Sequence, residues 1–375
     1  MSLLWFLVLL AALLALLSLR GDSAKALYWS QSPPALAAPP PATLIVPVKG
    51  HDEGLRDNLA ALAAQDYPDF ELIVCARAPE DIPAGVVPAS ARVVYSHAPD
   101  PHTGEKIQNL LAAIDAARPA STVLAFADSD ARPLPHWLRA LTAAALDSTT
   151  GVATGYRWYI PERGLASHLR SAWNSVIAGG YGPASAAFCW GGAMAIRREL
   201  FERLAIRDAW RAQVSDDYVM SARVRAAGLR IAFVPGALTP ARDHSSAREL
   251  LSWTARQLLL TRVYRPDLWR LALFAHVVYC AAMPAAAVLA LNGHAAALAP
   301  LALQLAIGMT KAARRVRWAS AALGQPAGSQ LLHAALSPAV TWLWLYALLA
   351  SSFDNILAWR GVRYRLSREG CERIG

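Results

Sequence analysis

Charged residues are scarce in this chain of 375 amino acids. Asp, Glu, Lys and Arg together make up 17% of the sequence, against about 25% in an ordinary soluble domain. Hydrophobic residues make up 55%. This excess argues against a wholly soluble protein and excludes a disordered one.

The strongly apolar stretches at residues 1–19, 271–291, 295–310 and 334–353 contain no Asp, Glu, Lys or Arg. A helix that crosses the hydrocarbon core needs about 17–25 such residues. The first stretch has no basic residue before it and no convincing cleavage site after it, so we predict a retained anchor rather than a signal peptide. Two or three more spans are expected near the C-terminus. Pro338 leaves open whether the last one is re-entrant.

Cysteine is also rare, with no CxxC pair and no zinc-ligand spacing among the four residues. We therefore expect free, buried thiols in a reducing compartment. They are Cys75, Cys189, Cys280 and Cys371.

Acidic residues are fewer than basic ones, 27 against 36, and the net charge is +9. The basic residues cluster beside the apolar stretches, at Arg20 and Lys25, at Arg314, Arg315 and Arg317, and at Arg360, Arg363, Arg365 and Arg368. Basic loops stay in the cytoplasm and are attracted to anionic headgroups, so a nucleic-acid partner is not expected. We predict a multi-pass protein of the cytoplasmic (inner) membrane with its large middle region in the cytoplasm. An even number of C-terminal spans returns the tail to the cytoplasm, and three would place it outside.

The chain divides by composition into four regions. They are an anchor at 1–22, a Pro-rich linker at 23–42, a cytoplasmic domain at 43–265, and a C-terminal membrane region with a basic tail at 266–375.

The middle region alternates strands with helices. Short apolar runs predict strands at 43–48, 70–75, 91–95 and 122–127, and helical periodicity follows Leu55 and covers 104–117. This alternation of strands and helices indicates an α/β domain with a mostly parallel, Rossmann-like sheet. In such sheets ligands bind beyond the carboxyl ends of the strands.

Two acidic pairs are candidates for chemistry. Asp128-Ser129-Asp130 directly follows the fourth strand. Two carboxylates at this spacing in a turn can approach one Mg²⁺ or Mn²⁺ ion, although Asp and Ser also favour turns for structural reasons. Asp216 and Asp217 are adjacent carboxylates whose repulsion raises one pKa, which suits a general base. The alternative is that Ser215 and the two acids cap a helix.

Three further motifs are weaker alone. Lys106 and Asn109 share a helix face, where they can meet a nucleotide or only solvent. Glu80-Asp81 follows the second strand. The glycine pair at 190–193 (WGGA) allows close approach of a ligand but matches neither phosphate-loop pattern, so it supports no ATP or dinucleotide site.

Taken in order, these motifs resemble a membrane glycosyltransferase of family 2 type, most closely the ceramide glucosyltransferase branch with its bacterial relatives. The resemblance extends from TLIVPVKG at 43–50 to the WRGVRYRL motif at 359–366. It implies a GT-A fold flanked by transmembrane helices, a nucleotide-sugar donor such as UDP-glucose, Mg²⁺ or Mn²⁺, and inversion at the anomeric carbon. The implied acceptor is the hydroxyl of a membrane lipid such as ceramide, or else a hopanoid or isoprenoid lipid.

The resemblance also implies roles for individual residues. Asp217, beside Asp216, would be the general base. Donor binding falls on Asp81, Lys106, Asn109 and Asp128, and metal binding on Asp128 and Asp130.

One motif departs from the family pattern. The expected (Q/R)xxRW begins at Arg256, but Leu259 and Leu260 replace the Arg-Trp pair. Arg262 or Arg265 is then a candidate for the donor diphosphate. Loss of the tryptophan argues against the alternative of a processive polysaccharide synthase. The sequence gives no indication of the oligomeric state.

Overall fold

The structure is a computed structural model that describes residues 1–31, 36–97 and 99–375. The chain forms two compact units. The sheet unit comprises residues 28–158, 180–241 and 356–375, and the helical unit comprises residues 1–27, 159–179 and 242–355. The Pro-rich linker expected at 23–42 begins instead as helix α2 (Asp22–Trp29), and its residues 32–35 lie outside the described part of the chain.

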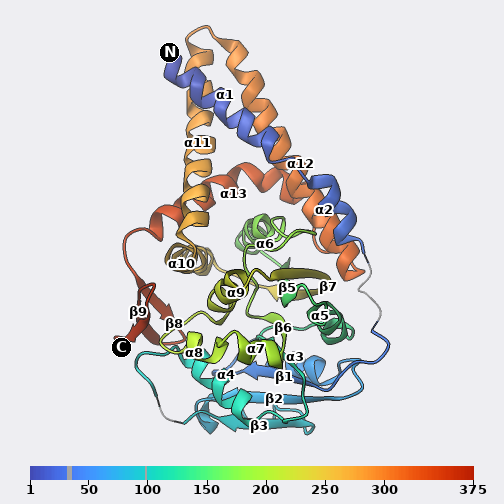
Figure 1. The fold of residues 1–375 in the computed structure, drawn as a ribbon. Helices are drawn as coiled ribbons and strands as arrows, with labels where there is room; N and C mark the ends of the chain where they lie inside the picture. Colours follow the sequence, from blue (N-terminus) through green and yellow to red (C-terminus); the bar gives the residue numbers. More distant parts are fainter. Residues whose placement is uncertain (32–35, 98) are drawn as a thin grey trace. The chain divides into compact units, whose positions relative to one another are not determined.

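The sheet unit is built on a seven-stranded sheet with the order β3-β2-β1-β4-β6-β5-β7 (Figure 1). Its first four members are parallel, and β6 pairs antiparallel with both β4 and β5. The strands are β1 (Ala42–Pro47), β2 (Phe70–Ala76), β3 (Ala91–Tyr95), β4 (Val123–Ala127), β5 (Thr150–Pro161), β6 (Ala193–Arg197) and β7 (Arg230–Asp243).

The predicted α/β fold with a mostly parallel sheet and flanking membrane helices is confirmed. Strands β1 to β4 lie within one residue of their predicted bounds. The apolar runs of β1, β2 and β4 are largely buried on both faces, as inner parallel strands require, whereas the edge strand β3 is only partly buried. Leu44 in β1 lies between Leu72 and Ala125 of the neighbouring strands, and all three are buried.

Helices pack around this sheet and place residues at its carboxyl edge. Helix α9 begins at Asp216, and the Ser215 hydroxyl caps it by accepting a hydrogen bond from the Tyr218 N–H at 3.2 Å, as the alternative interpretation of this motif expected. The helices of the sheet unit are α3 (Leu55–Ala63), α4 (Glu105–Ala116), α5 (Trp137–Ala145), α7 (Arg198–Arg203), α8 (Ile206–Trp210) and α9 (Asp216–Ala226), with a short 3₁₀ turn at Pro79–Asp81.

The C-terminal residues also belong to the sheet unit, not to the membrane region expected at 266–375. Strands β8 (Ile356–Trp359) and β9 (Val362–Leu366) form a hairpin that β10 (Cys371–Arg373) extends. Arg360 and Gly361 both have positive φ, 48° and 78°. This is the backbone that a tight two-residue hairpin turn demands.

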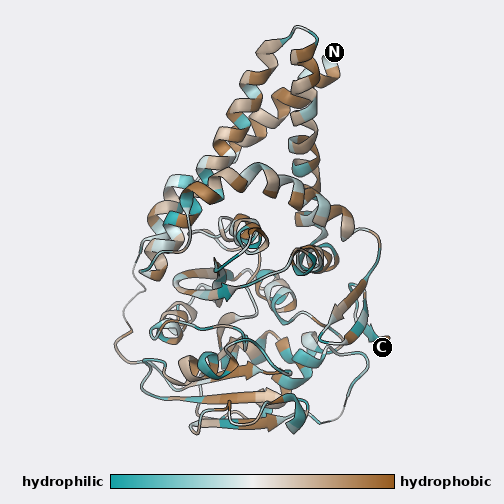
Figure 2. Cartoon of the chain, turned by 180° about the vertical axis from the view of Figure 1, so that it is seen from behind, coloured by the Kyte–Doolittle hydropathy of each residue, from teal (hydrophilic) through white to brown (hydrophobic). Residues whose placement is uncertain are grey.

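The helical unit contains the long apolar segments. In the described part of the chain, four helical segments are long and apolar enough to cross a membrane: Ser2–Trp29, Pro266–Leu291, Ala295–Leu323 and Gln330–Ala350. Figure 2 shows these helices largely in the hydrophobic colours. The unit consists of α1 (Ser2–Leu17), α6 (Leu165–Ala178), α10 (Ala247–Tyr264), α11 (Pro266–Leu291), α12 (Leu298–Leu323) and α13 (Gln330–Ala350), with a 3₁₀ turn at Ala295–Ala297.

Two details of this unit differ from expectation. Helix α10 lies in the helical unit, although the predicted cytoplasmic domain extended to residue 265. Helix α13 runs through Pro338 without a break.

Candidate functional site

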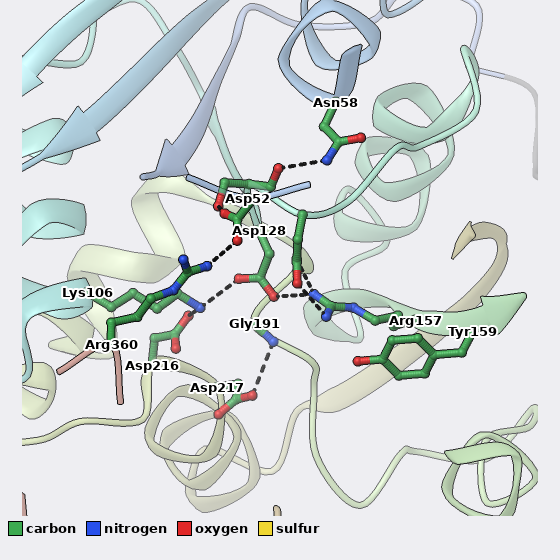
Figure 3. Close-up of polar contacts among 12 residues, drawn as sticks. Asp52, Asn58, Lys106, Asp128, Arg157, Tyr159, Gly191, Asp216, Asp217 and Arg360 are labelled. Atoms are coloured by element: carbon green, nitrogen blue, oxygen red, sulfur yellow. Dashed lines mark hydrogen bonds and ion pairs between the residues drawn. The ribbon is translucent and has the colours of Figure 1, made fainter. Parts of the chain in front are cut away.

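Acids from two distant parts of the sequence meet at one lysine (Figure 3). The Lys106 Nζ atom, from the first turn of α4, lies 3.1 Å from an oxygen of Asp128 and 3.1 Å from an oxygen of Asp216. Burial alone would lower the pKa of Lys106, but the two carboxylates outweigh it and raise that pKa above its ordinary value. The ammonium group is therefore a fixed positive charge between the predicted metal motif and the predicted base motif.

A second cation, which the sequence did not reveal, holds the Asp128-Ser129-Asp130 turn. The Arg157 guanidinium, from β5, contacts Asp130 at 2.5 and 2.8 Å and Asp128 at 3.0 Å. Its carbon lies 4.9 Å from the ring centre of Trp190. Lys106 and Arg157 together outweigh the effect of burial and lower the pKa of Asp128 below its ordinary value. Asp128 is thus ionised and accepts hydrogen bonds through both of its oxygens.

The two neighbouring acids at the start of α9 have different surroundings. Asp216 is buried beside Lys106, and burial, with the charges of Asp217 and Asp128, raises its pKa to about 6. Asp217 is partly exposed and accepts three hydrogen bonds, from the Ser215 hydroxyl, the Tyr218 N–H and the Gly191 N–H. A carboxylate has about four acceptor positions, so Asp217 keeps one for a further donor.

The glycine pair of the WGGA segment is explained by close packing against these acids. A Cβ atom at Gly191 would lie 2.7 Å from an oxygen of Asp216, and one at Gly192 would lie 2.5 Å from an oxygen of Asp128. Neither distance is compatible with a side chain. The segment therefore brings backbone against carboxylates, rather than against a phosphate as a phosphate loop would.

The C-terminal hairpin contributes a third basic residue. Arg360 forms an ion pair with Asp52, whose other oxygen accepts a hydrogen bond from the Ser129 hydroxyl at 2.6 Å. The Asn58 amide donates to the Ser129 carbonyl at 3.1 Å. The turn that carries Asp128 and Asp130 is thereby fixed from both sides.

Two predicted donor-binding residues are not in this cluster. Asn109 is buried and accepts a hydrogen bond from Ser96 at 2.6 Å, and the Asp81 carbonyl accepts one from the Gly50 N–H at 2.7 Å. In the part of the chain that the structure describes, neither residue makes a hydrogen bond or ion pair with the clustered acids. Asp81 does follow β2, as predicted.

Arg256 and Arg262 lie on α10 in the helical unit. Arg262 donates to the carbonyls of Ser352 and Asp354 and to the Asn355 side chain, so it fixes the segment after α13. Leu259, at the expected arginine position, is buried. The guanidinium of Arg262 is therefore engaged within its own unit.

Comparison with solved structures shows the fold. The mannosyltransferase PcManGT from Pyrobaculum calidifontis, solved with GDP-mannose and Mn²⁺, is 18% identical, with a TM-score of 0.51 over 88% of this chain and 98% of that one. Glucosyl-3-phosphoglycerate synthase from Mycobacterium tuberculosis, solved with UDP and Mn²⁺, is 18% identical over 60% of this chain and 79% of that one, and its TM-score of 0.38 carries no argument. No curated protein matches the sequence. The sequence model of glycosyl transferase family 21 matches residues 3–371, and the chain is therefore a glycosyltransferase that belongs to this family.

Proposed function

We propose that the protein transfers a hexose from a nucleotide sugar, UDP-glucose in the first instance, to the hydroxyl of a membrane lipid such as ceramide, with inversion at the anomeric carbon. The observation that carries the proposal is the convergence of Asp128, from the end of β4, and Asp216, from the start of α9, on Lys106. Separate carboxylates for the leaving group and the acceptor are what a direct displacement requires.

The Asp128-Ser129-Asp130 turn fits a divalent cation. Its carboxylates are hard oxygen donors of the kind that Mg²⁺ and Mn²⁺ prefer, and both already accept hydrogen bonds from the Arg157 cation. Among the described residues, no group of three His, Cys, Asp or Glu side chains is arranged to hold a metal alone. Oxygens of a donor diphosphate would complete the coordination, and the bound ion would offset negative charge on the departing diphosphate.

Asp217 is the general base in this proposal. Its three hydrogen bonds fix the carboxylate, and its remaining acceptor position can take the proton of an attacking hydroxyl. Asp216 is buried against Lys106 and holds that lysine in place. We assign the lysine and Asp128 to the donor, as the family resemblance implied. Asp81, Asn109, Arg256 and Arg262 remain donor-binding candidates on that resemblance alone.

The parity of the spans supports the membrane arrangement that we propose. Residues 180–241 and 356–375 belong to one compact unit and must lie on the same side of the membrane, so the chain between them crosses an even number of times. Arg314 and Arg317, near the end of α12, favour the cytoplasm. We propose that α1, α11 and α12 cross the cytoplasmic membrane, that α13 does not, and that the sheet unit faces the cytoplasm.

The test is transfer of labelled sugar to lipid. Membranes that contain the full chain are incubated with labelled UDP-glucose, UDP-N-acetylglucosamine or GDP-mannose, together with ceramide, a hopanoid polyol or a polyprenyl lipid. We expect one organic-soluble glycolipid, with a new β-linkage if the donor sugar is an α-anomer. Excess EDTA abolishes the product, and Mn²⁺ restores it.

The same assay identifies the alternatives. A hopanoid or polyprenyl product would replace ceramide as the acceptor, and a high-molecular-weight polymer would indicate a processive synthase. Full activity in EDTA would reject the metal, and a retained anomeric configuration would reject direct displacement.

A further inference from the structure

A cavity of about 210 Å³ lies among the helices of the helical unit. It is larger than the cavity of about 150 Å³ that holds a benzene molecule in an engineered protein. Residues of α1, α6, α11, α12 and α13 line it. All of these residues belong to the helical unit, so the cavity is independent of the acid cluster described above.

One end of the cavity is basic. Lys311, Arg315 and His333 line it, and no Asp or Glu is among the lining residues. Lys311 donates to the Ser18 carbonyl at 2.7 Å, and the fully buried His333 lies 3.3 Å from the Ser171 hydroxyl. The Lys311 ammonium and the His333 ring are thus held in place by groups of neighbouring segments.

Arg315 is only partly satisfied by the neighbouring residues. Its Nε atom is buried and makes no hydrogen bond within the described residues. The nearby carboxylate of Asp22 lies 3.5 Å from Arg314 instead. At Gly179, a Cβ atom would lie 2.6 Å from the Arg315 side chain, so a residue without a side chain makes room for the arginine. Lys311, Arg314 and Arg315 thus share the carboxylate of Asp22, which leaves net positive charge for a further anion, because an uncompensated charge is costly in an apolar environment.

The other end of the cavity is apolar. Ile307, Val340 and Trp344 line it, and Trp344 stacks on Trp173 with ring centres 4.5 Å apart. A Cβ atom at Gly308 would lie 3.2 Å from the Ser337 hydroxyl, so α12 and α13 pack closely where they line the cavity. The lining therefore matches an amphiphile, not a free ion.

The expected depth of α12 in the membrane agrees with a basic end and an apolar end of the cavity. Helix α12 has 26 residues, and at about 1.5 Å per residue it is longer than the hydrocarbon core of roughly 30 Å. Its basic residues lie in its C-terminal half. Lys311 and Arg315 are thereby within reach of the headgroup layer.

We propose that this cavity binds the phosphate headgroup of an anionic membrane lipid, with the phosphate at Lys311, Arg315 and His333 and the start of the acyl chain against Ile307 and Trp344. A neutral lipid would bring no negative charge to the basic end beyond that of Asp22. Free phosphate would leave the apolar end empty.

The experiment measures lipid retention in the absence of a sugar donor. The full chain is reconstituted in phosphatidylcholine nanodiscs with or without phosphatidic acid, and retained lipid is counted by native mass spectrometry. We expect preferential retention of phosphatidic acid, reduced about tenfold in Arg315→Gln and Lys311→Gln and kept in Arg315→Lys. Arg317→Gln is the matched control, because Arg317 is an exposed arginine of the same helix that does not line the cavity.

Equal retention of phosphatidylcholine and phosphatidic acid by the wild type would overturn the proposal. So would an unchanged preference in the folded Arg315→Gln variant, or displacement of phosphatidic acid by inorganic phosphate at equal concentration. Monodisperse elution of each variant is the check on folding. Because no donor is present, failure here leaves the glycosyl transfer assay unaffected.

Discussion

The Arg157 guanidinium lies 2.5 Å from Asp130 and 3.0 Å from Asp128, so it bridges the two carboxylates that we assign to the metal. A divalent ion at these oxygens competes with this internal cation. Metal binding without the donor must therefore displace part of the Arg157 contacts, at the cost of charge-assisted hydrogen bonds.

Arg157→Gln is accordingly expected to tighten Mn²⁺ binding to the donor-free protein by roughly tenfold, the factor that about 1.4 kcal/mol gives. Electron paramagnetic resonance of free Mn²⁺ measures this directly. Arg92→Gln, on the exposed edge of the same sheet, is the control. Unchanged or weaker Mn²⁺ binding would mean that the guanidinium and the ion do not compete.

Asp217→Asn is expected to lower kcat by about 10²–10⁴, the usual contribution of a general base. The amide can still accept a hydrogen bond but cannot take up the proton of the acceptor. Initial rates at saturating donor and acceptor measure the effect, and donor KM should change little. Asp208→Asn, an exposed acid of the same unit that pairs with Arg211, is expected to keep full activity. A kcat within threefold of the wild-type value would mean that another residue is the general base.

The raised pKa of Asp216, about 6, makes stability depend on pH. An unfolded Asp titrates near 3.9, so the folded chain binds more protons between these two values. The free energy of unfolding attributable to this group is therefore highest below pH 4 and falls as the pH rises to about 6.

Asp216→Asn removes this dependence, because the amide does not titrate. Melting temperatures are measured by intrinsic fluorescence in detergent. As the pH rises from 4 to 7, the melting temperature of the variant should increase relative to that of the wild type. A constant difference across that range would contradict the assignment.

The sequence predicted the part of the site that strands and local motifs determine. Asp128 and Asp130 could be placed because they directly follow an uninterrupted apolar strand, and Ser215 indicated the start of α9. Arg157 could not be placed, since a single arginine in the strand TGVATGYRWYIP has no local pattern that distinguishes it from a surface residue. Arg360 pairs with Asp52 across 308 residues of sequence, and nothing local links the two.

Arg360→Gln tests whether the C-terminal hairpin supports the acidic turn. The substitution leaves Asp52 without its ion pair and loosens its hold on Ser129. Because Arg360 is partly exposed, we expect a loss of about 1–2 kcal/mol in stability, together with weaker Mn²⁺ binding. Thermal unfolding and Mn²⁺ titration measure the two effects.

Arg363→Gln, an exposed arginine of the same hairpin, should change neither. Loss of stability with normal Mn²⁺ binding would restrict Arg360 to a purely structural role.

Single cysteines can establish how the chain crosses the membrane. The four native cysteines are buried, so they give little background labelling. Asn292→Cys reports the connection between α11 and α12, Gln325→Cys the connection between α12 and α13, and Arg368→Cys the C-terminal hairpin; all three positions are exposed.

We expect a membrane-impermeant maleimide to label Asn292→Cys in intact cells, and the other two positions only after permeabilisation. This result follows if α11 and α12 cross and α13 lies along the cytoplasmic surface, because the hairpin shares a compact unit with the acid cluster. Labelling of Gln325→Cys in intact cells, with Arg368→Cys still protected, would instead make α13 the returning span. Exposure of Arg368→Cys alone would be incompatible with the hairpin and the acid cluster lying on one side, and would remove the parity argument altogether.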